Sequence, residues 1–185
     1  GSCGGLLTLE IGSDGVLTYM ANDVSVNYYY GLTVTDDHIF VSANDHLLSY
    51  SRTDPSEPEF LGSIHTDSSN WDIIVDDDYA YIAAQTYGIR IIDITDPADM
   101  TFVENATWND GYTLDVEIRG DLLYVADGNN DLVVIDVSNR SAPYWPDDDG
   151  IVKYFDTSGY VNDMEVVGDY TYVADGNYGL TVLDT

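Results

Sequence analysis

The segment Tyr-Val-Ala-Asp-Gly-Asn at residues 124–129 decides the fold, because it returns unchanged at residues 172–177. Looser copies begin at Tyr81 and Phe40, so the four aromatic anchors are spaced by 41, 43 and 48 residues. A motif that recurs at such a period indicates a repeat architecture. We therefore expect the chain to consist of about four copies of one unit.

The residues around each anchor keep the same register. An acid or its replacement stands nine residues before each anchor, as Asp72, Asp115 and Asp163 in three copies and as Gly31 in the first. After the anchor, a turn leads into an apolar segment that ends in an acid, as in residues 132–136. Alternating apolar residues between Gly, Asn and Asp turns predict four short strands in each unit. Four antiparallel strands in a unit of roughly 40–50 residues form the blade of a β-propeller.

This pattern resembles the LVIVD-repeat family. The resemblance rests on residues 71–96, 114–139 and 161–184, which share Asp-Val-x-Val, Tyr-Val-Ala-Asp-Gly and Gly-Leu-x-Ile-Ile-Asp, and residues 31–55 are a degenerate copy. It implies propeller-type repeats that are frequent in bacterial and archaeal surface or secreted proteins, and it supplies no general set of catalytic residues.

We accordingly expect an all-β fold with one propeller domain over residues 1–185. It should contain about four four-stranded antiparallel blades, as a complete ring or as part of a larger propeller. The expected repeats cover residues 28–68, 69–111, 112–159 and 160–185, and residues 5–20 complete the last of them.

The two ends of the chain carry a duplicated strand. Residues 5–10 match residues 179–184, both as the third strand of a blade, and a fourth strand follows at residues 16–20. In a closed ring of four blades, residues 16–20 would complete the last blade, so the termini would interlock there and residues 6–10 would be one strand too many. The chain is then a piece of a longer propeller, or one terminal strand lies outside the blade, or one adds to a neighbouring molecule and can form a filament. The residues expected in such an assembly are Leu6, Leu7, Thr8, Leu9, Leu180, Val182 and Leu183.

The charge of the chain excludes some partners. Asp and Glu number 34 against 5 Lys and Arg, which gives a net charge of −29. Such a charge repels nucleic acid and anionic lipid, and no apolar run is long enough to insert into a membrane. The charge also destabilises the folded state by self-repulsion unless counter-ions screen it. The high salt of a salt-loving organism or calcium-containing extracellular fluid would supply such ions. In the alternative interpretation, the acidity is that of an ordinary acidic surface.

Two sets of oxygen-bearing side chains are candidates for Ca²⁺, which prefers oxygen ligands. The first set would gather around the propeller axis, and the second has oxygens at alternate positions, as at the start of a calcium loop: Asp72, Asp115 and Asp163; Asp127, Asn129 and Asp131. In the alternative interpretation, each axial aspartate accepts hydrogen bonds at the start of its own strand, and the second set forms a hairpin turn. We expect no required cofactor, and Ca²⁺ is the one ion considered.

Other reactive residues give little indication of chemistry. The three histidines, His38, His46 and His65, lack metal-ligand spacing, and nothing marks a catalytic nucleophile. Cys3 is the single cysteine, so no internal disulfide forms; Ser2-Cys3 resembles the end of a lipoprotein signal, with a lipid anchor at Cys3, or is a cloning remnant.

The favoured interpretation is therefore a non-enzymatic, extracellular or cell-surface propeller that binds a protein partner or itself. The alternative is a carbohydrate-active or carbohydrate-binding propeller that uses acidic residues together with the aromatic Trp71, Trp108 and Trp145. A fragment of a larger receptor or enzyme is the third hypothesis.

Overall fold

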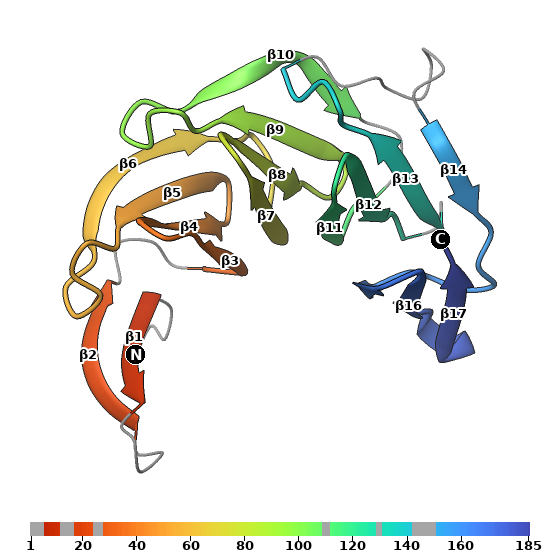
Figure 1. Cartoon of the computed structure of the whole chain (residues 1–185), viewed down its shortest axis with the longest axis horizontal. Coiled ribbons are helices and arrows are strands. Elements are labelled where there is room, and N and C mark those ends of the chain that lie inside the picture. Colours follow the sequence, from red (N-terminus) through yellow and green to blue (C-terminus); the bar gives the residue numbers. More distant parts are fainter. Residues whose placement is uncertain (1–5, 12–16, 24–27, 109–111, 129–130, 142–150) are drawn as a thin grey trace.

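The computed structural model describes residues 6–11, 17–23, 28–108, 112–128, 131–141 and 151–185. Cys3, Asn129 and Trp145 lie outside these ranges. Within them the chain is all-β, as predicted, and its strands form five antiparallel sheets that follow one another along an arc (Figure 1).

Three of the sheets are complete four-stranded blades whose strands are paired in chain order. Blade 1 contains β3 (Gly31–Val34), β4 (His38–Ala43), β5 (His46–Ser51) and β6 (Glu59–His65). Blade 2 contains β7 (Asp72–Asp76), β8 (Tyr79–Ala83), β9 (Ile89–Asp93) and β10 (Thr101–Trp108). Blade 3 contains β11 (Asp115–Arg119), β12 (Leu122–Ala126), β13 (Leu132–Asp136) and β14 (Ile151–Phe155).

The sheets at the two ends of the arc have fewer strands. Blade 4 has three strands, β15 (Asp163–Val167), β16 (Tyr170–Ala174) and β17 (Leu180–Asp184). The other end is a two-stranded hairpin of β1 (Leu6–Ile11) and β2 (Leu17–Asp23).

The turns between the first and second strands show why the repeat keeps its register. Asp77, Gly120 and Gly168 lie in the corresponding turns of blades 2, 3 and 4, with φ values of 50°, 60° and 63°. Gly and Asp tolerate this left-handed conformation, which allows the chain to reverse within a few residues. The turn residues seen in the sequence therefore mark the strand ends correctly.

The core lies between the faces of neighbouring blades. One cluster joins Tyr81 and Ile91 of blade 2 to Val125, Val133 and Ile135 of blade 3. Similar clusters join blade 1 to blade 2 and blade 3 to blade 4. The central strands of blades 2 and 3 are buried on both faces, whereas those of blade 4 alternate between buried and exposed residues. The central strands of blade 1 are also buried on both faces, so among the described blades it is blade 4 that leaves one face of its central strands exposed.

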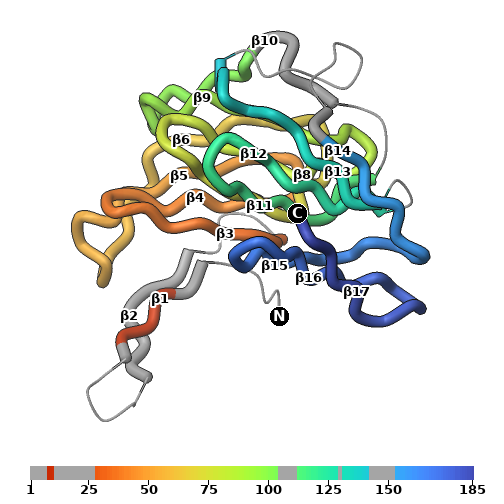
Figure 2. Tube along the Cα trace, turned by 45° about the vertical axis from the view of Figure 1, so that its right-hand side comes forward, coloured from red at the N-terminus to blue at the C-terminus, as the bar shows by residue number. Residues whose placement is uncertain are grey.

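In the described residues, the two termini do not interlock in one blade as expected. Strand β2, which the sequence assigns to the last blade, pairs with β1, and β17 is the last strand of blade 4. Figure 1 places the hairpin and blade 4 at opposite ends of the arc, and Figure 2 gives a second view of blades 1 to 4, turned by 45°. The physical reason is the short loop between β1 and β2, because closing a short loop costs less entropy than joining the two ends of the chain.

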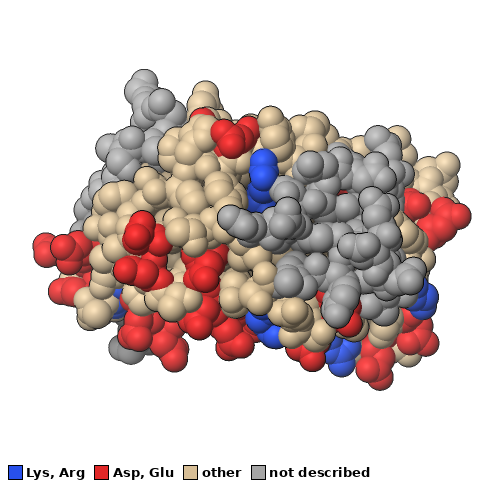
Figure 3. All heavy atoms as spheres, turned by 90° about the horizontal axis from the view of Figure 1, so that it is seen from above, with Lys and Arg blue, Asp and Glu red and all other residues tan. Residues whose placement is uncertain are grey.

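The surface carries a large excess of acidic side chains. Figure 3 shows many of them along the lower part of that view, with few Lys or Arg side chains among them. In the part of the chain that the structure describes, no helix has the length and apolar character needed to cross a membrane.

Candidate interaction site

The three axial aspartates begin the first strands of successive blades, which we call the inner strands. Asp72, Asp115 and Asp163 are the first residues of β7, β11 and β15. Strand β11 lies between the other two, so the structure brings these residues side by side, as the repeat predicted. We call these three residues the carboxylate row.

Two backbone N–H groups, those of Val116 and Met164, each donate to two aspartates of the carboxylate row and so join two blades. Val116 N–H donates to Asp115 Oδ1 at 3.0 Å and to Asp72 Oδ2 of the preceding blade at 3.3 Å. Met164 N–H donates to Asp163 Oδ1 at 3.1 Å and to Asp115 Oδ2 of the preceding blade at 2.7 Å. Asp115 and Asp163 thus cap their own strands with Oδ1, and Asp72 and Asp115 bind the next blade with Oδ2.

The proximity of these carboxyl groups changes their ionisation. Burial, followed by the hydrogen bond and the charge of Asp72, raises the pKa of Asp115 to about 9. Asp115 is therefore protonated at neutral pH and can share its proton with a neighbouring carboxylate. Two residues along the same strand, burial raises the pKa of Glu117, although its bond from Val166 N–H opposes the change.

The carboxylate row does not have the arrangement of a metal site. Across the described ranges, no group of three His, Cys, Asp or Glu side chains is placed to hold a metal ion. Backbone N–H donors occupy the oxygens that the Ca²⁺ hypothesis needs. The observed bonds favour the alternative, in which the aspartates accept hydrogen bonds at the strand starts, and they add a bond to the next blade.

The second candidate Ca²⁺ set lies in a turn. Asp127 is buried and its N–H donates to the Asp131 carbonyl at 3.0 Å. Asp131 Oδ1 accepts the Thr157 hydroxyl at 3.1 Å, and Asn129 lies outside the described residues. At the corresponding place in blade 4, Asp175 Oδ2 accepts Ser158 N–H at 3.2 Å. Both aspartates therefore hold structural turns at this level of the repeat.

Two histidines that are distant in sequence meet on blade 1. His46 Nδ1 and His65 Nε2 lie 2.8 and 3.1 Å from the two carboxylate oxygens of Asp45. His65 Nδ1 also lies 3.0 Å from Asp67 Oδ1. The hydrogen bond to His46 is the main reason why the pKa of Asp45 falls to about 2. This surface network ties the turn before β5 to the end of β6, and the sequence spacing gave no sign of it.

The outer face of blade 4 is exposed and carries apolar side chains beside the acids Asp163 and Glu165. Tyr172, Leu180 and Val182 are exposed by 40%, 69% and 51%. The equivalent residues of blade 3 are covered by blade 4, and Leu132 and Val134, which correspond to Leu180 and Val182, are exposed by 0% and 3%. We call Tyr172, Leu180 and Val182 the C-terminal face. Its residues have the character of an interface between blades.

Blade 1 presents the opposite half of such an interface. Leu32 and Val34 on its inner strand are exposed by 56% and 50%. Val116, which occupies the position of Leu32 in blade 3, is exposed by only 2% because blade 2 covers it. We call Leu32 and Val34 the N-terminal face. Their partners on the same side of the sheet, Val41 and Ile39, are buried, so this side of blade 1 is open only along its inner strand. The two ends of the arc are thus complementary by the logic of the repeat.

The residues expected to assemble the protein divide between the two ends. Leu6, Leu7, Thr8 and Leu9 belong to β1, where Leu9 is exposed. Leu180 and Val182 lie on the C-terminal face, whereas Leu183 packs against the core between blades 3 and 4. The structure therefore leaves Leu9, Leu180 and Val182 accessible.

Three aromatic rings stack on the surface at the start of the inner strands. Tyr28 and Tyr30 have centroids 6.5 Å apart, and Tyr30 and Trp71 lie 5.7 Å apart with nearly parallel planes. All three are exposed, and we call them the aromatic stack. Trp71 was a candidate from the sequence, and Tyr30, which was not, holds the same position before the first strand of blade 1 that Trp71 holds before the first strand of blade 2. This shared position is the signal that could have identified Tyr30.

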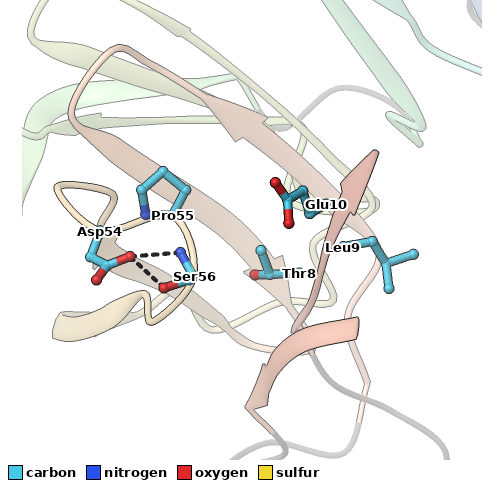
Figure 4. Close-up of a pocket in the computed structure, with 6 residues that line it drawn as sticks. All are labelled: Thr8, Leu9, Glu10, Asp54, Pro55 and Ser56. Atoms are coloured by element: carbon cyan, nitrogen blue, oxygen red, sulfur yellow. Dashed lines mark hydrogen bonds between the residues drawn. The ribbon is translucent and has the colours of Figure 1, made fainter. Parts of the chain in front are cut away.

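A shallow cleft of about 290 Å³ separates the hairpin from blade 1. Thr8, Leu9 and Glu10 of β1 line one side, and the turn Asp54-Pro55-Ser56 lines the other (Figure 4). Asp54 Oδ1 accepts the N–H and the hydroxyl of Ser56 at 2.9 and 2.6 Å. Because the Asp54 carboxylate is engaged in its own turn, the cleft has the character of a contact between hairpin and blade.

Comparison with known proteins supports the repeat and the fold. The model of the LVIVD repeat matches residues 68–107, 110–145 and 158–185. No curated protein matches the chain.

Solved structures share the fold at low sequence identity. The designed protein Ika4 has a TM-score of 0.67 and 8% identity, with 88% of this chain and 93% of that chain covered. The designed protein Ika8 has a TM-score of 0.68 and 8% identity, with 92% and 50% covered. A functionally unknown protein from Desulfotomaculum acetoxidans DSM 771 has a TM-score of 0.77 and 14% identity, with 93% and 56% covered. The chain thus spans about half the length of the last two proteins.

Proposed function

The chain belongs to the LVIVD-repeat family, and from this we propose that it is a non-enzymatic interaction and structural propeller of the cell surface or the extracellular space. The family is not known for catalysis. The repeats of this chain resemble those that are frequent in surface and secreted proteins, which supports a location at the cell surface or outside the cell. The acidic surface suits a protein whose charge is screened by salt.

The observation that carries the proposal is the unpaired edge of blade 4. Strand β17 pairs with β16 on one side and has no fourth strand on the other in the part of the chain described. An open edge beside an exposed apolar face is a place where another strand adds. Strand β2 is a suitable donor, because the sequence assigns it to the fourth position of a blade. We propose that β2 of one copy leaves β1 and pairs with β17 of another.

Sedimentation equilibrium over a range of concentrations, at low and high salt, tests this proposal. The wild-type chain should self-associate more strongly in high salt, because salt screens repulsion between the acidic copies. Leu180→Asp should prevent the association. Tyr154→Asp is the matched control, since Tyr154 is exposed on the outer strand of blade 3. A chain that stays monomeric under all conditions would contradict the proposal.

The aromatic stack favours a second candidate, binding of a carbohydrate. Exposed, nearly parallel aromatic rings offer apolar surfaces against which sugar rings can pack. Titration of tryptophan fluorescence with a panel of neutral oligosaccharides tests it. A saturable change that Trp71→Ala removes and Tyr154→Ala keeps would support this function, and no change with any oligosaccharide would reject it.

A further inference from the structure

Three interfaces along the arc follow one plan. At each, an apolar face of one blade packs on the next blade, through the clusters between blades 1 and 2, 2 and 3, and 3 and 4. At the last two, the carboxylate row adds bonds between inner strands. This plan predicts what a further interface would contain.

Asp163 holds half of such an interface. Its Oδ1 accepts Met164 N–H of its own strand, as Asp115 Oδ1 accepts Val116 N–H. The other oxygen of Asp115 binds the next blade, but the structure describes no blade beyond blade 4. Asp163 is exposed beside the C-terminal face. The position therefore has an acceptor ready for the backbone N–H of another inner strand.

Leu32 supplies the N–H that this position requires. In the strand ladders, Leu32 pairs with Val41 where Val116 pairs with Val125 and Met164 with Val173. Because backbone direction follows from position in an antiparallel ladder, Leu32 N–H points away from β4 as the N–H groups of Val116 and Met164 point away from their partner strands. Leu32 is also part of the exposed N-terminal face.

Gly31 explains why blade 1 is the suitable neighbour for Asp163. A blade that began with aspartate would place a fourth acid beside the carboxylate row, where Asp115 already shares its environment with two carboxyl groups. Blade 1 has Gly31 at this position. The Leu32 N–H would then be bonded to Asp163 alone, without a second carboxylate competing for it.

We propose that blade 4 of one copy docks on blade 1 of a second copy, with Asp163 accepting the Leu32 N–H and the C-terminal face covering the N-terminal face. This inference rests on the proposed self-assembly and names the residues that set its register. The contact is head-to-tail, so it closes a ring or grows a filament according to the angle of the arc.

The duplicated terminal strand makes room for this contact. Residues 6–10 of β1 and residues 180–184 of β17 have matching sequences, Leu-Leu-Thr-Leu-Glu and Leu-Thr-Val-Leu-Asp. Both are third strands, so β17 of the docking copy takes the place of β1 beside β2. Strand β1 thus occupies in the single copy the position that β17 of the neighbour takes in the assembly.

Sedimentation equilibrium of Asp163→Ala, Asp163→Asn and the control Asp156→Ala tests the proposal at high salt. Asp156 is exposed on the connection between blades 3 and 4, and its removal changes the charge equally. Asp163→Ala should weaken self-association at least about tenfold, the effect of losing one charged hydrogen bond. Asp163→Asn keeps an acceptor oxygen and should lose less, and Asp156→Ala should behave as the wild type.

The outcomes separate the two proposals. If Leu180→Asp prevents association while both Asp163 variants associate as the wild type does, the strand exchange stands and the role of Asp163 is overturned. If no variant and no wild-type chain associates, both fail. Equal weakening by Asp163→Ala and Asp156→Ala would also overturn the role of Asp163, because removing either acid lowers the repulsion between copies and only the loss of a specific contact at Asp163 should weaken association.

Discussion

Replacing Asp115 by Asn should remove a pH-dependent part of the stability. The pKa of Asp115 is raised from 3.8 to about 9 in the folded chain, so its contribution is complete below pH 3.8 and is lost as the pH rises through about 9. The folded state binds more protons than the unfolded state in this window, and stability falls by up to about 1.4 kcal/mol for each pH unit. From pH 7 to pH 9 the wild type should therefore lose about 2–3 kcal/mol through this group.

The Asn variant should be nearly as stable as the wild type at pH 7. Its amide oxygen can accept Met164 N–H, and its NH₂ group can donate to Asp72. Val116 N–H then loses Asp115 Oδ1 as an acceptor and keeps Asp72 Oδ2. Above pH 7 the variant keeps its stability, because it has no proton to lose, and it should become the more stable protein at pH 9.

Urea unfolding followed by tryptophan fluorescence at pH 7, 8 and 9 measures the difference. Asp136→Asn is the control, because a hydrogen bond from Ser138 lowers the pKa of Asp136 and keeps it ionised throughout this range. Its stability should run parallel to that of the wild type. The reasoning is refuted if Asp115→Asn also runs parallel to the wild type between pH 7 and pH 9.

Four other substitutions test contacts within and between the blades by the same unfolding measurement. Ile135→Ala, in the fully buried cluster between blades 2 and 3, should cost about 2–5 kcal/mol, and a loss below 1 would show that this interface is not packed. Gly159→Ala should destabilise more than Gly168→Ala, because its Cβ would clash with the Asp175 carbonyl oxygen, whereas that of Gly168 meets nothing within 4 Å. The φ of +63° at Gly168 should cost about 1 kcal/mol, and the reverse order would contradict the geometry. Arg140→Met removes ion pairs that join the turns of blades 2 and 3; it should cost about 1 kcal/mol at low salt and less at high salt, and an unchanged cost would exclude an electrostatic origin.

The repeated motif was sufficient to predict the blades. Spacing of the aromatic anchors placed β8, β12 and β16 correctly, because strand alternation and turn residues are local properties. The row of Asp72, Asp115 and Asp163 was also predictable, since equivalent residues of a repeat lie at equivalent positions around an axis.

The partners of the carboxylate row were not predictable. The donor to Asp115 Oδ2 is Met164 N–H, which is 49 residues away and belongs to another blade. The exposure of individual side chains could not be predicted either. Leu132 and Leu180 occupy the same position of the motif, and only the presence of a neighbouring blade distinguishes them. Whether the arc closes depends on the angles between blades, which accumulate along the chain and leave no mark in any single repeat.

A cross-linking experiment between two differently labelled copies tests the central claim most directly. In a Cys3→Ser background, one copy carries Thr33→Cys on β3 and the other Glu165→Cys on β15, the residue equivalent to Thr33. If blade 4 of one copy docks on blade 1 of the next, a short bismaleimide should cross-link the two different copies. A sample that contains only one of the two cysteine variants should remain largely uncross-linked. Failure to join the two copies at concentrations where the protein associates, or an intramolecular link in dilute chains carrying both cysteines, would contradict the head-to-tail assembly.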